Sequence, residues 1–332
     1  MTVAASSPPT QAGPDRPRVS ASLQGVAYGD RFFKILLTIA ALLIPILLAF
    51  LLWELWAGSR LAMSKFGFDF IRTSIWDPVA EKFGAFPLIF GTLLSSFLAL
   101  LIAVPLSLGV AVYLTEFAPK FLRQPVAFVI GLLAAIPSVV YGLWGIFVLI
   151  PMLRKTVFPA LRAVLGFLPF FHGPIYGPSM LSASVILAIM VMPYVMSVSR
   201  EVLLAVPNSQ REAALALGAT RWEAVITAVV PYARSGIVGA IILGLGRALG
   251  ETMAVTMLIG NRHEISASLF APGYTMAAVI ANEFSEAATD MHFSALTYVA
   301  LVLFVLTVLV NAGARLLIWR VARGSAVGSK AL

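Results

Sequence analysis

The sequence has no cysteine, only three histidines and few charges. Without cysteine, the chain cannot form a disulfide, a zinc–thiolate site, an iron–sulfur cluster or a cysteine nucleophile. The histidines, His172, His263 and His292, are at least 29 residues apart, which is no metal-ligand spacing, and we expect them to be isolated, solvated loop residues. Charged residues make up 11% of the 332 residues, and 60% are hydrophobic. Soluble domains average about 25% charged, so an ordinary soluble enzyme and a disordered chain are both excluded.

The sequence contains several long apolar runs with few charged residues. A helix needs about 20 apolar residues to cross the hydrocarbon core of a bilayer. Six runs reach or approach this length, and few charged residues lie inside them. They cover residues 32–56, 86–115, 124–151, 181–199, 235–259 and 295–319. The sequence therefore predicts an all-α membrane protein with six transmembrane helices.

The distribution of Lys and Arg sets the expected orientation in the plasma (inner) membrane. With both termini cytoplasmic, the inner segments hold 14 of these residues and the outer segments hold 8, in accord with the positive-inside rule. The net charge of +8 then needs no nucleic acid as a partner, and membrane lipid is the expected surrounding. The expected parts are a disordered cytoplasmic tail (1–30), a first helix with an outer loop (31–85), a five-helix core (86–323) and a C-terminal tail (324–332). Another outer loop, 151–180, is apolar but rich in proline, and we expect short helices there.

The longest inner loop, residues 201–234, has the pattern of two short helices. Ser-x-x-Glu at 209–212 and Thr-x-x-Glu at 220–223 each match a capping box, which marks the start of a helix. Gly218 is typical of the residue that follows a helix, and Pro231 is expected to break the second helix. The small apolar residues of the first helix suit docking into a groove of another protein. A surface hairpin that only closes the loop is an equally weighted alternative.

Two opposite charges lie in the fifth apolar run. Arg247 is at its midpoint and Glu251 is four residues further on, so on one continuous helix they share a face and can pair. A charge in mid-bilayer costs at least about 2.5 kcal/mol, and Arg cannot lose its proton to avoid this. The guanidinium is a planar fork of donors suited to oxyanions, so the pair predicts an anion site on a translocation path. The alternative is a structural pair that holds helices in register.

Hydroxyl groups are available in the third run. Pro137 frees a backbone carbonyl within the span, and Ser138 and Tyr141 could supply hydroxyls beside it. We count both as candidate substrate ligands. A hydrogen bond to a neighbouring helix is the favoured alternative for each of them.

The inner loop carries a family motif. Glu212, Ala213 and Ala214, followed by Gly218 and then by Pro231 thirteen positions after the glycine, resemble the EAA loop of ABC importer permeases. That family has a coupling helix here, which sits in a cleft of the ATPase subunit. The resemblance implies that these residues contact an ATPase.

Two further segments narrow the resemblance. Residues 135–145, Ala-Ile-Pro-Ser-Val-Val-Tyr-Gly-Leu-Trp-Gly, and 246–252, Gly-Arg-Ala-Leu-Gly-Glu-Thr, resemble signature segments of phosphate ABC importer permeases of the PstC type. The resemblance implies a type I ABC importer permease fold. It also implies that Arg247 and Glu251 are the charged residues which that family uses in phosphate passage.

Partners follow from the same resemblance. It implies a homologous second permease, two ATP-binding cassette ATPase subunits and an extracytoplasmic phosphate-binding protein. The chain has no Gly-x4-Gly-Lys-Ser/Thr pattern, so ATP and Mg belong to the ATPase, and we expect no enzyme activity, cofactor or metal on this chain. Three alternatives stay open: an importer of another oxyanion such as sulfate or molybdate, an ion-coupled secondary transporter, and a regulatory or scaffold subunit. The secondary transporter is disfavoured because no internal repeat is visible.

Overall fold

The computed structural model describes residues 23–326, and the side chains of residues 31–316. Within these residues the regular structure is helical, apart from two isolated β-bridges. Six of the described helical stretches are long and apolar enough to cross a membrane, which confirms the predicted all-α membrane fold. They are Arg31–Phe66, Phe86–Phe117, Ser138–Leu165, Met180–Leu204, Arg221–Leu249 and Asp290–Leu316. The tails expected over 1–30 and 324–332 lie outside the described residues, except for helical turns at 23–30 and 324–326.

The chain divides into two units, residues 1–54 and 55–332. The described part of the first unit belongs to α1 (Leu23–Phe66), in which Pro45 lies without ending the helix. Every described side chain from 31 to 54 is exposed, and most of them are apolar. A helix that is apolar on all sides is suited to lipid.

α8 (Met180–Leu204) is the central helix of the second unit. α3 (Phe86–Val112) and α11 (Val230–Leu249) pack along it, and α12 (Met253–Ile259) packs against its first half. Contacts on several sides leave no side chain of α8 exposed between Met180 and Met196, which explains why this part of its sequence is apolar without a helical period.

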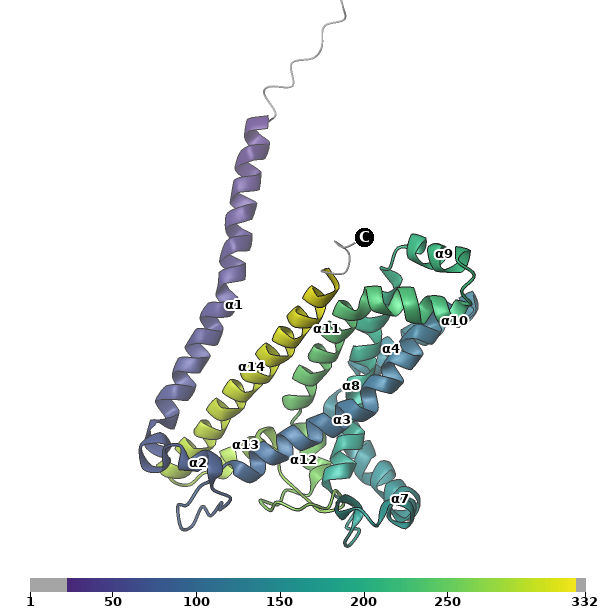
Figure 1. Cartoon of the computed structure of the whole chain (residues 1–332). Coiled ribbons are helices and arrows are strands. Elements are labelled where there is room, and N and C mark those ends of the chain that lie inside the picture. The colour runs from purple at the N-terminus through teal and green to yellow at the C-terminus, as the bar shows by residue number, and fades with distance from the viewer. Residues whose placement is uncertain (1–22, 327–332) are drawn as a thin grey trace, which may run out of the picture. The chain divides into compact units, whose positions relative to one another are not determined.

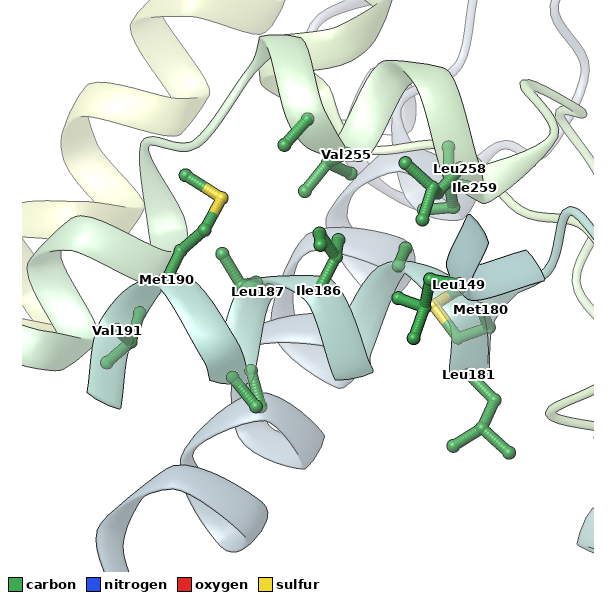
Figure 2. Close-up of a cluster of buried hydrophobic side chains, with 14 of the residues drawn as sticks. Leu149, Met180, Leu181, Ile186, Leu187, Met190, Val191, Val255, Leu258 and Ile259 are labelled. Carbon is green, nitrogen blue, oxygen red and sulfur yellow. The ribbon is translucent and has the colours of Figure 1, made fainter. Parts of the chain in front are cut away.

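The core between α8 and α12 is made of aliphatic side chains. Figure 2 shows Ile186 and Leu187 of α8 in one cluster with Val255 and Leu258 of α12. α11 comes close to α8 from another side, because a Cβ on Gly244 would lie only 2.6 Å from a methyl of Val195. The glycine is therefore needed for the close approach of these two helices.

The third predicted span, 124–151, is not one helix, and this corrects the prediction. α4 (Lys120–Ala135) ends where Ile136 and Pro137 adopt extended backbone angles, and α5 (Ser138–Trp144) starts a new helix. Proline lacks the N–H of the helical ladder and disfavours the helical conformation of the residue before it. From α5, helical structure then continues to Leu165, into the segment predicted as an outer loop.

That continuation is possible because π-turns precede the later prolines. η2 (Gly145–Leu149) leads into α6 (Ile150–Met152), and η3 (Leu153–Val157) leads into α7 (Phe158–Leu165). Pro151 and Pro159 each occupy the second position after a π-turn. We attribute their tolerance to the wider turn, which relieves the clash of the proline ring with the preceding carbonyl and requires no N–H there.

A π-turn also precedes Pro231, and it makes the predicted helix break at this proline wrong. α10 (Arg221–Ala224) continues through η5 (Val225–Val229) into α11, with Pro231 at the second position of α11. The proline therefore does not break the helix. The break comes later, because α11 ends at Leu249 and α12 starts only at Met253, so the predicted span 235–259 is interrupted.

Short elements gather at two ends of the second unit (Figure 1). One end carries α9 (Asn208–Ala216) and α10, and we call it the α9 end. The other, the α13 end, carries several other short elements and the start of α14. They are α2 (Asp69–Arg72), η4 (Pro169–Phe171), α13 (Met276–Glu283), η6 (Phe284–Glu286) and α14 (Asp290–Ala326). α3 runs from the α13 end toward the α9 end, where η1 (Tyr113–Phe117) extends it.

Candidate functional site

Arg247 and Glu251 meet at the break between α11 and α12. Arg247 is in the last turn of α11, and its Nη2 lies 3.3 Å from Oε2 of Glu251. Glu251 is in the break itself, where its Oε1 accepts the N–H of Ala254 at 3.4 Å. The predicted pair is present, but it does not lie on one continuous helix face. A cation in the last turn of a helix faces the negative end of the helix dipole, which favours it.

The two charges differ in burial. The side chain of Arg247 is 39% exposed, whereas that of Glu251 is 3% exposed. Within the described part of the chain, Nε of Arg247 has no hydrogen-bond partner, although the atom is buried. A small anion that reaches this site would therefore meet the guanidinium first, with donors available for its oxygens.

Tyr194 of α8 completes the surroundings of the arginine. Its ring centroid lies 5.6 Å from Cζ of Arg247, within the range of a cation–π contact. Its hydroxyl donates to the carbonyl of Ala134 at 3.0 Å, at the end of α4. The sequence analysis missed Tyr194, and the available signal was a hydroxyl-bearing aromatic next to Pro193 in the middle of an apolar run.

The break at Pro137 lies beside this group. The hydroxyl of Tyr141 donates to the carbonyl of Leu133 at 2.9 Å, so Tyr141 and Tyr194 each bond to a carbonyl in the last turn of α4, where the break interrupts the helical ladder. Tyr141 thus makes the structural hydrogen bond that was its favoured alternative. Ser138 is half-buried at the start of α5, and its hydroxyl makes no hydrogen bond within the described residues.

The α9 end carries the hairpin of α9 and α10. α9 ends in a Schellman motif, in which Gly218 N–H donates to the Leu215 carbonyl at 3.0 Å and Ala219 N–H donates to the Ala214 carbonyl at 3.2 Å. Gly218 has φ +87°, a conformation that glycine adopts without strain. The helix stop predicted at Gly218 is confirmed.

Of the two predicted capping boxes, one is confirmed and one is wrong. Thr220 Oγ1 accepts the N–H of Glu223 at 3.3 Å, and Glu223 accepts the N–H of Thr220 at 2.7 Å. At 209–212 there is no box, because α9 already starts at Asn208 after Pro207. Ser209 is therefore inside the first turn and cannot cap it.

The residues of the EAA-like motif lie largely on the surface. Glu212, Ala213 and Gly218 are exposed, and Ala214 is half-buried. Leu217, just before the glycine, has 91% of its surface exposed. Large apolar side chains exposed on a polar hairpin are typical of a surface that another protein covers.

The prediction of isolated, solvated histidines is wrong for His263 and His292, which meet at Glu283 at the α13 end. His292 is in the first turn of α14 with 8% of its side chain exposed, and its Nε2 lies 3.2 Å from Oε2 of Glu283. The indole N–H of Trp76 donates to the same oxygen at 2.8 Å. The ring of His263 stacks on Trp76, and its Nε2 lies 3.5 Å from Oε1 of Glu283 without a hydrogen bond.

The spacing of residues along the chain could not reveal the cluster of His263, Glu283 and His292, because the three residues come from three separate segments. Burial lowers the pKa of His263 to about 4 and raises the pKa of the neighbouring Tyr274 to about 12. Among the described residues, no group of three or more His, Cys, Asp or Glu side chains could hold a metal ion.

Residues 103–323 match the model of the family "Binding-protein-dependent transport system inner membrane component". A phosphate transport system permease protein PstC of Mesorhizobium japonicum is 46% identical over 305 residues, which cover 91% of this chain and 93% of that protein. PstC of Xylella fastidiosa is 47% identical over 301 residues, covering 90% and 93%. The chain belongs to the PstC-type permeases of this family.

A solved structure agrees with this membership at the level of the fold. A bacterial ABC transporter involved in the import of the acidic polysaccharide alginate has a chain with TM-score 0.56 and 19% identity, covering 86% of this chain and 98% of that one. As a PstC-type permease, the chain is a multi-pass inner membrane subunit of a transport system and not an enzyme. The matched region contains the charged pair, both helix breaks and the α9–α10 hairpin.

Proposed function

We propose that this chain is a membrane-spanning subunit of an ATP-driven importer that moves inorganic phosphate across the inner membrane. One observation carries the proposal: Arg247 is partly exposed beside a buried Glu251 at a helix break inside the membrane domain. The relatives named for phosphate transport support the choice of substrate.

In this proposal, phosphate exchanges places with Glu251 as the partner of Arg247. The guanidinium contacts Glu251 through Nη2 at 3.3 Å, and its Nε has no hydrogen-bond partner within the described residues, so the fork has a donor left for a second anion. The ring of Tyr194 limits where the guanidinium can lie. Ser138 would add a hydroxyl ligand, and Tyr141 would act by fixing the helix break from which Ser138 projects.

The α9–α10 hairpin is the proposed coupling element. Glu212, Ala213, Ala214 and Gly218 would dock into a cleft of an ATPase subunit, which holds the ATP and Mg. The exposure of Leu217 and the rigid Schellman end of α9 support this role. Each permease of a pair would engage one of two ATPase subunits, and the second permease would be a homologous chain.

The orientation is part of the proposal. The α9 end would face the cytoplasm together with both termini, as the excess of Lys and Arg in those segments indicates. The α13 end would then face outward, where an extracytoplasmic phosphate-binding protein delivers the substrate. Nucleic acid has no place in this assembly.

The test is phosphate uptake by membrane vesicles that contain the complete importer, normalised to the amount of this subunit. We expect Arg247→Gln to assemble and to lose at least about tenfold in uptake, because a charge-assisted bond contributes about 1.5–3 kcal/mol. Arg60→Gln is the matched control, since Arg60 is exposed and remote in sequence from the pair. Normal uptake by Arg247→Gln would contradict the proposal.

The same vesicles separate the alternatives. An importer of another oxyanion would lose phosphate uptake in excess sulfate or molybdate, whereas a phosphate importer would not. An ion-coupled transporter would work without ATP and stop when the ion gradient is removed. A scaffold subunit would leave transport unaffected by any change at the pair.

A further inference from the structure

The α9–α10 hairpin is held to the rest of the second unit by an unusual link. None of the residues of α9 is buried, so the hydrophobic effect attaches this helix only weakly. Its side-chain link to the core is Arg211, whose own side chain is only 20% exposed. The residue therefore reaches from a surface helix into the molecule.

Arg211 bonds to three segments with one guanidinium. Its Nε and Nη2 form a two-pronged ion pair with Glu116 of η1, with distances from 2.8 to 3.2 Å. Its Nη2 also donates to the carbonyl of Leu203 in α8 at 3.0 Å, and its Nη1 donates to the carbonyl of Val206 at 2.6 Å. This geometry uses the planar fork of arginine, which lysine cannot reproduce.

The ion pair is largely withdrawn from solvent, and its rupture is therefore costly. Glu116 has 13% of its side chain exposed, and removing one partner of such a pair leaves a charge without compensation. The next residue, Phe117, lies with its ring 6.1 Å from that of Trp222 in α10. Both helices of the hairpin are thus attached to the same π-turn at the end of α3.

α8 connects this attachment to the charged pair. Leu203, which accepts the bond from Arg211, and Tyr194, which lies against Arg247, belong to the same continuous helix. A displacement of α9 that is carried by Arg211 therefore reaches α8 directly, and through Tyr194 it reaches Arg247.

We propose that Arg211 is the positioning residue that couples the hairpin to the transport pathway, by making α9 move as one body with the adjacent ends of α3 and α8. The inference rests on the proposed function, in which an ATPase pushes or pulls on α9. Without this link, α9 would follow the ATPase while α8 and the site stay behind.

The experiment measures phosphate uptake and ATP hydrolysis together, in proteoliposomes with the complete importer. We expect Arg211→Gln to remain bound to the ATPase and to hydrolyse ATP, while phosphate moved per ATP falls about fivefold or more. Arg211→Lys keeps the charge without the planar fork, so its phosphate moved per ATP should lie between the values of the wild type and Arg211→Gln. Arg200→Gln is the matched control, because the one ion pair of Arg200 with a described residue is that with its neighbour Glu201 on the same helix.

Further variants exclude a purely stabilising role. Glu116→Gln removes the ion pair to η1 but leaves the bonds of Arg211 to the Leu203 and Val206 carbonyls, so it should lower the ratio less than Arg211→Gln does. The double variant should be no worse than Arg211→Gln alone, because Arg211 takes part in every bond of the link. If Arg211→Gln fails to assemble, Arg211→Lys and Glu116→Gln carry the test. An unchanged ratio in the assembled variants, with only lower abundance, would overturn the inference.

The outcome is separable from that of the proposed function. Should the wild-type importer move a different oxyanion, the proposed substrate would be wrong, and the ratio would be measured with that anion. Loss of coupling in the Arg211 and Glu116 variants would then still support the link.

Discussion

At the scale of single residues, burial decides what the two charges at the helix break can do. Glu251 is fixed by its burial and by the N–H of Ala254, whereas Arg247 is open on one side. Only the arginine is therefore placed to exchange partners. The two positions are not equivalent, although the net charge of the pair would be the same in either order.

This asymmetry gives the first prediction. Arg247→Glu combined with Glu251→Arg keeps the pairing but buries the cation in the break and exposes the carboxylate. We expect uptake to fall at least about tenfold, because the exposed carboxylate repels phosphate and the arginine has no open side. Uptake per assembled subunit is the measurement. A pair that only holds helices in register would tolerate the exchange. Near-normal uptake would therefore show that the pair has this structural role and is not an anion site.

A second prediction concerns acid and His263. Burial lowers its pKa to about 4, from about 6.5 in an unfolded chain. Between these two values the unfolded chain binds a proton that the folded chain does not, so the free energy of unfolding increases with pH. This contribution is complete above pH 6.5 and is lost as the pH falls toward 4. As the pH is lowered from 6.5 toward 4, the melting temperature in detergent should therefore fall more steeply for the wild type than for His263→Gln.

The comparison of the two proteins isolates the contribution of His263, because every other residue is the same in both. The neighbouring His292 and Glu283 are among these shared residues. Parallel curves for the wild type and His263→Gln would show that the histidine is not withdrawn from solvent as the structure has it.

At the scale of elements, the turn between α9 and α10 is the most constrained. Gly218 has φ +87°, so Gly218→Val forces a β-branched residue into a left-handed conformation, at a cost of about 1–3 kcal/mol. We expect the variant to enter the membrane but to lose much of its association with the ATPase. Gly239→Ala is the control, since Gly239 is helical with nothing within 4 Å of an added Cβ. Co-purification of the ATPase at normal yield with Gly218→Val would refute the docking role.

The same elements show what the sequence could predict. Stops and starts that depend on local chemistry, such as Gly218 and the box at Thr220, follow from a few neighbouring residues and were predictable. The effect of a proline was not, because Pro137 ends a helix while Pro231 is accommodated by a π-turn that no local signal announces. The role of Arg211 depends on Glu116, 95 residues away in the chain.

At the scale of the whole molecule, the number of spans was predictable and their boundaries were not. Hydrophobicity and length determine whether a segment can cross the bilayer, and both are properties of the sequence. The break between α11 and α12 falls at residues 250–252 inside an apolar run, and hydropathy does not register it. Likewise, His263, Glu283 and His292 are brought together only by the packing of three segments at the α13 end.

Orientation supplies the last prediction, and the absence of cysteine makes it simple to test. Gln210→Cys places a thiol on exposed α9, and Ala267→Cys places one on an exposed loop between α12 and α13. In intact cells, a membrane-impermeant maleimide should label residue 267 and should label residue 210 only after permeabilisation. The wild type is the unlabelled background. The reverse pattern would invert the proposed topology.

The close pairing of Arg247 with Glu251 also has an electrical consequence. In the proposed function, an empty site whose arginine and glutamate stay paired carries no net charge, so the change of the empty importer back to its starting conformation does no work against the membrane potential. Each net negative charge added by a bound anion changes the work done against the membrane potential by about 2.3 kcal/mol per 100 mV. Voltage should therefore slow the loaded half of the cycle while leaving ATP turnover by the unloaded importer almost unchanged.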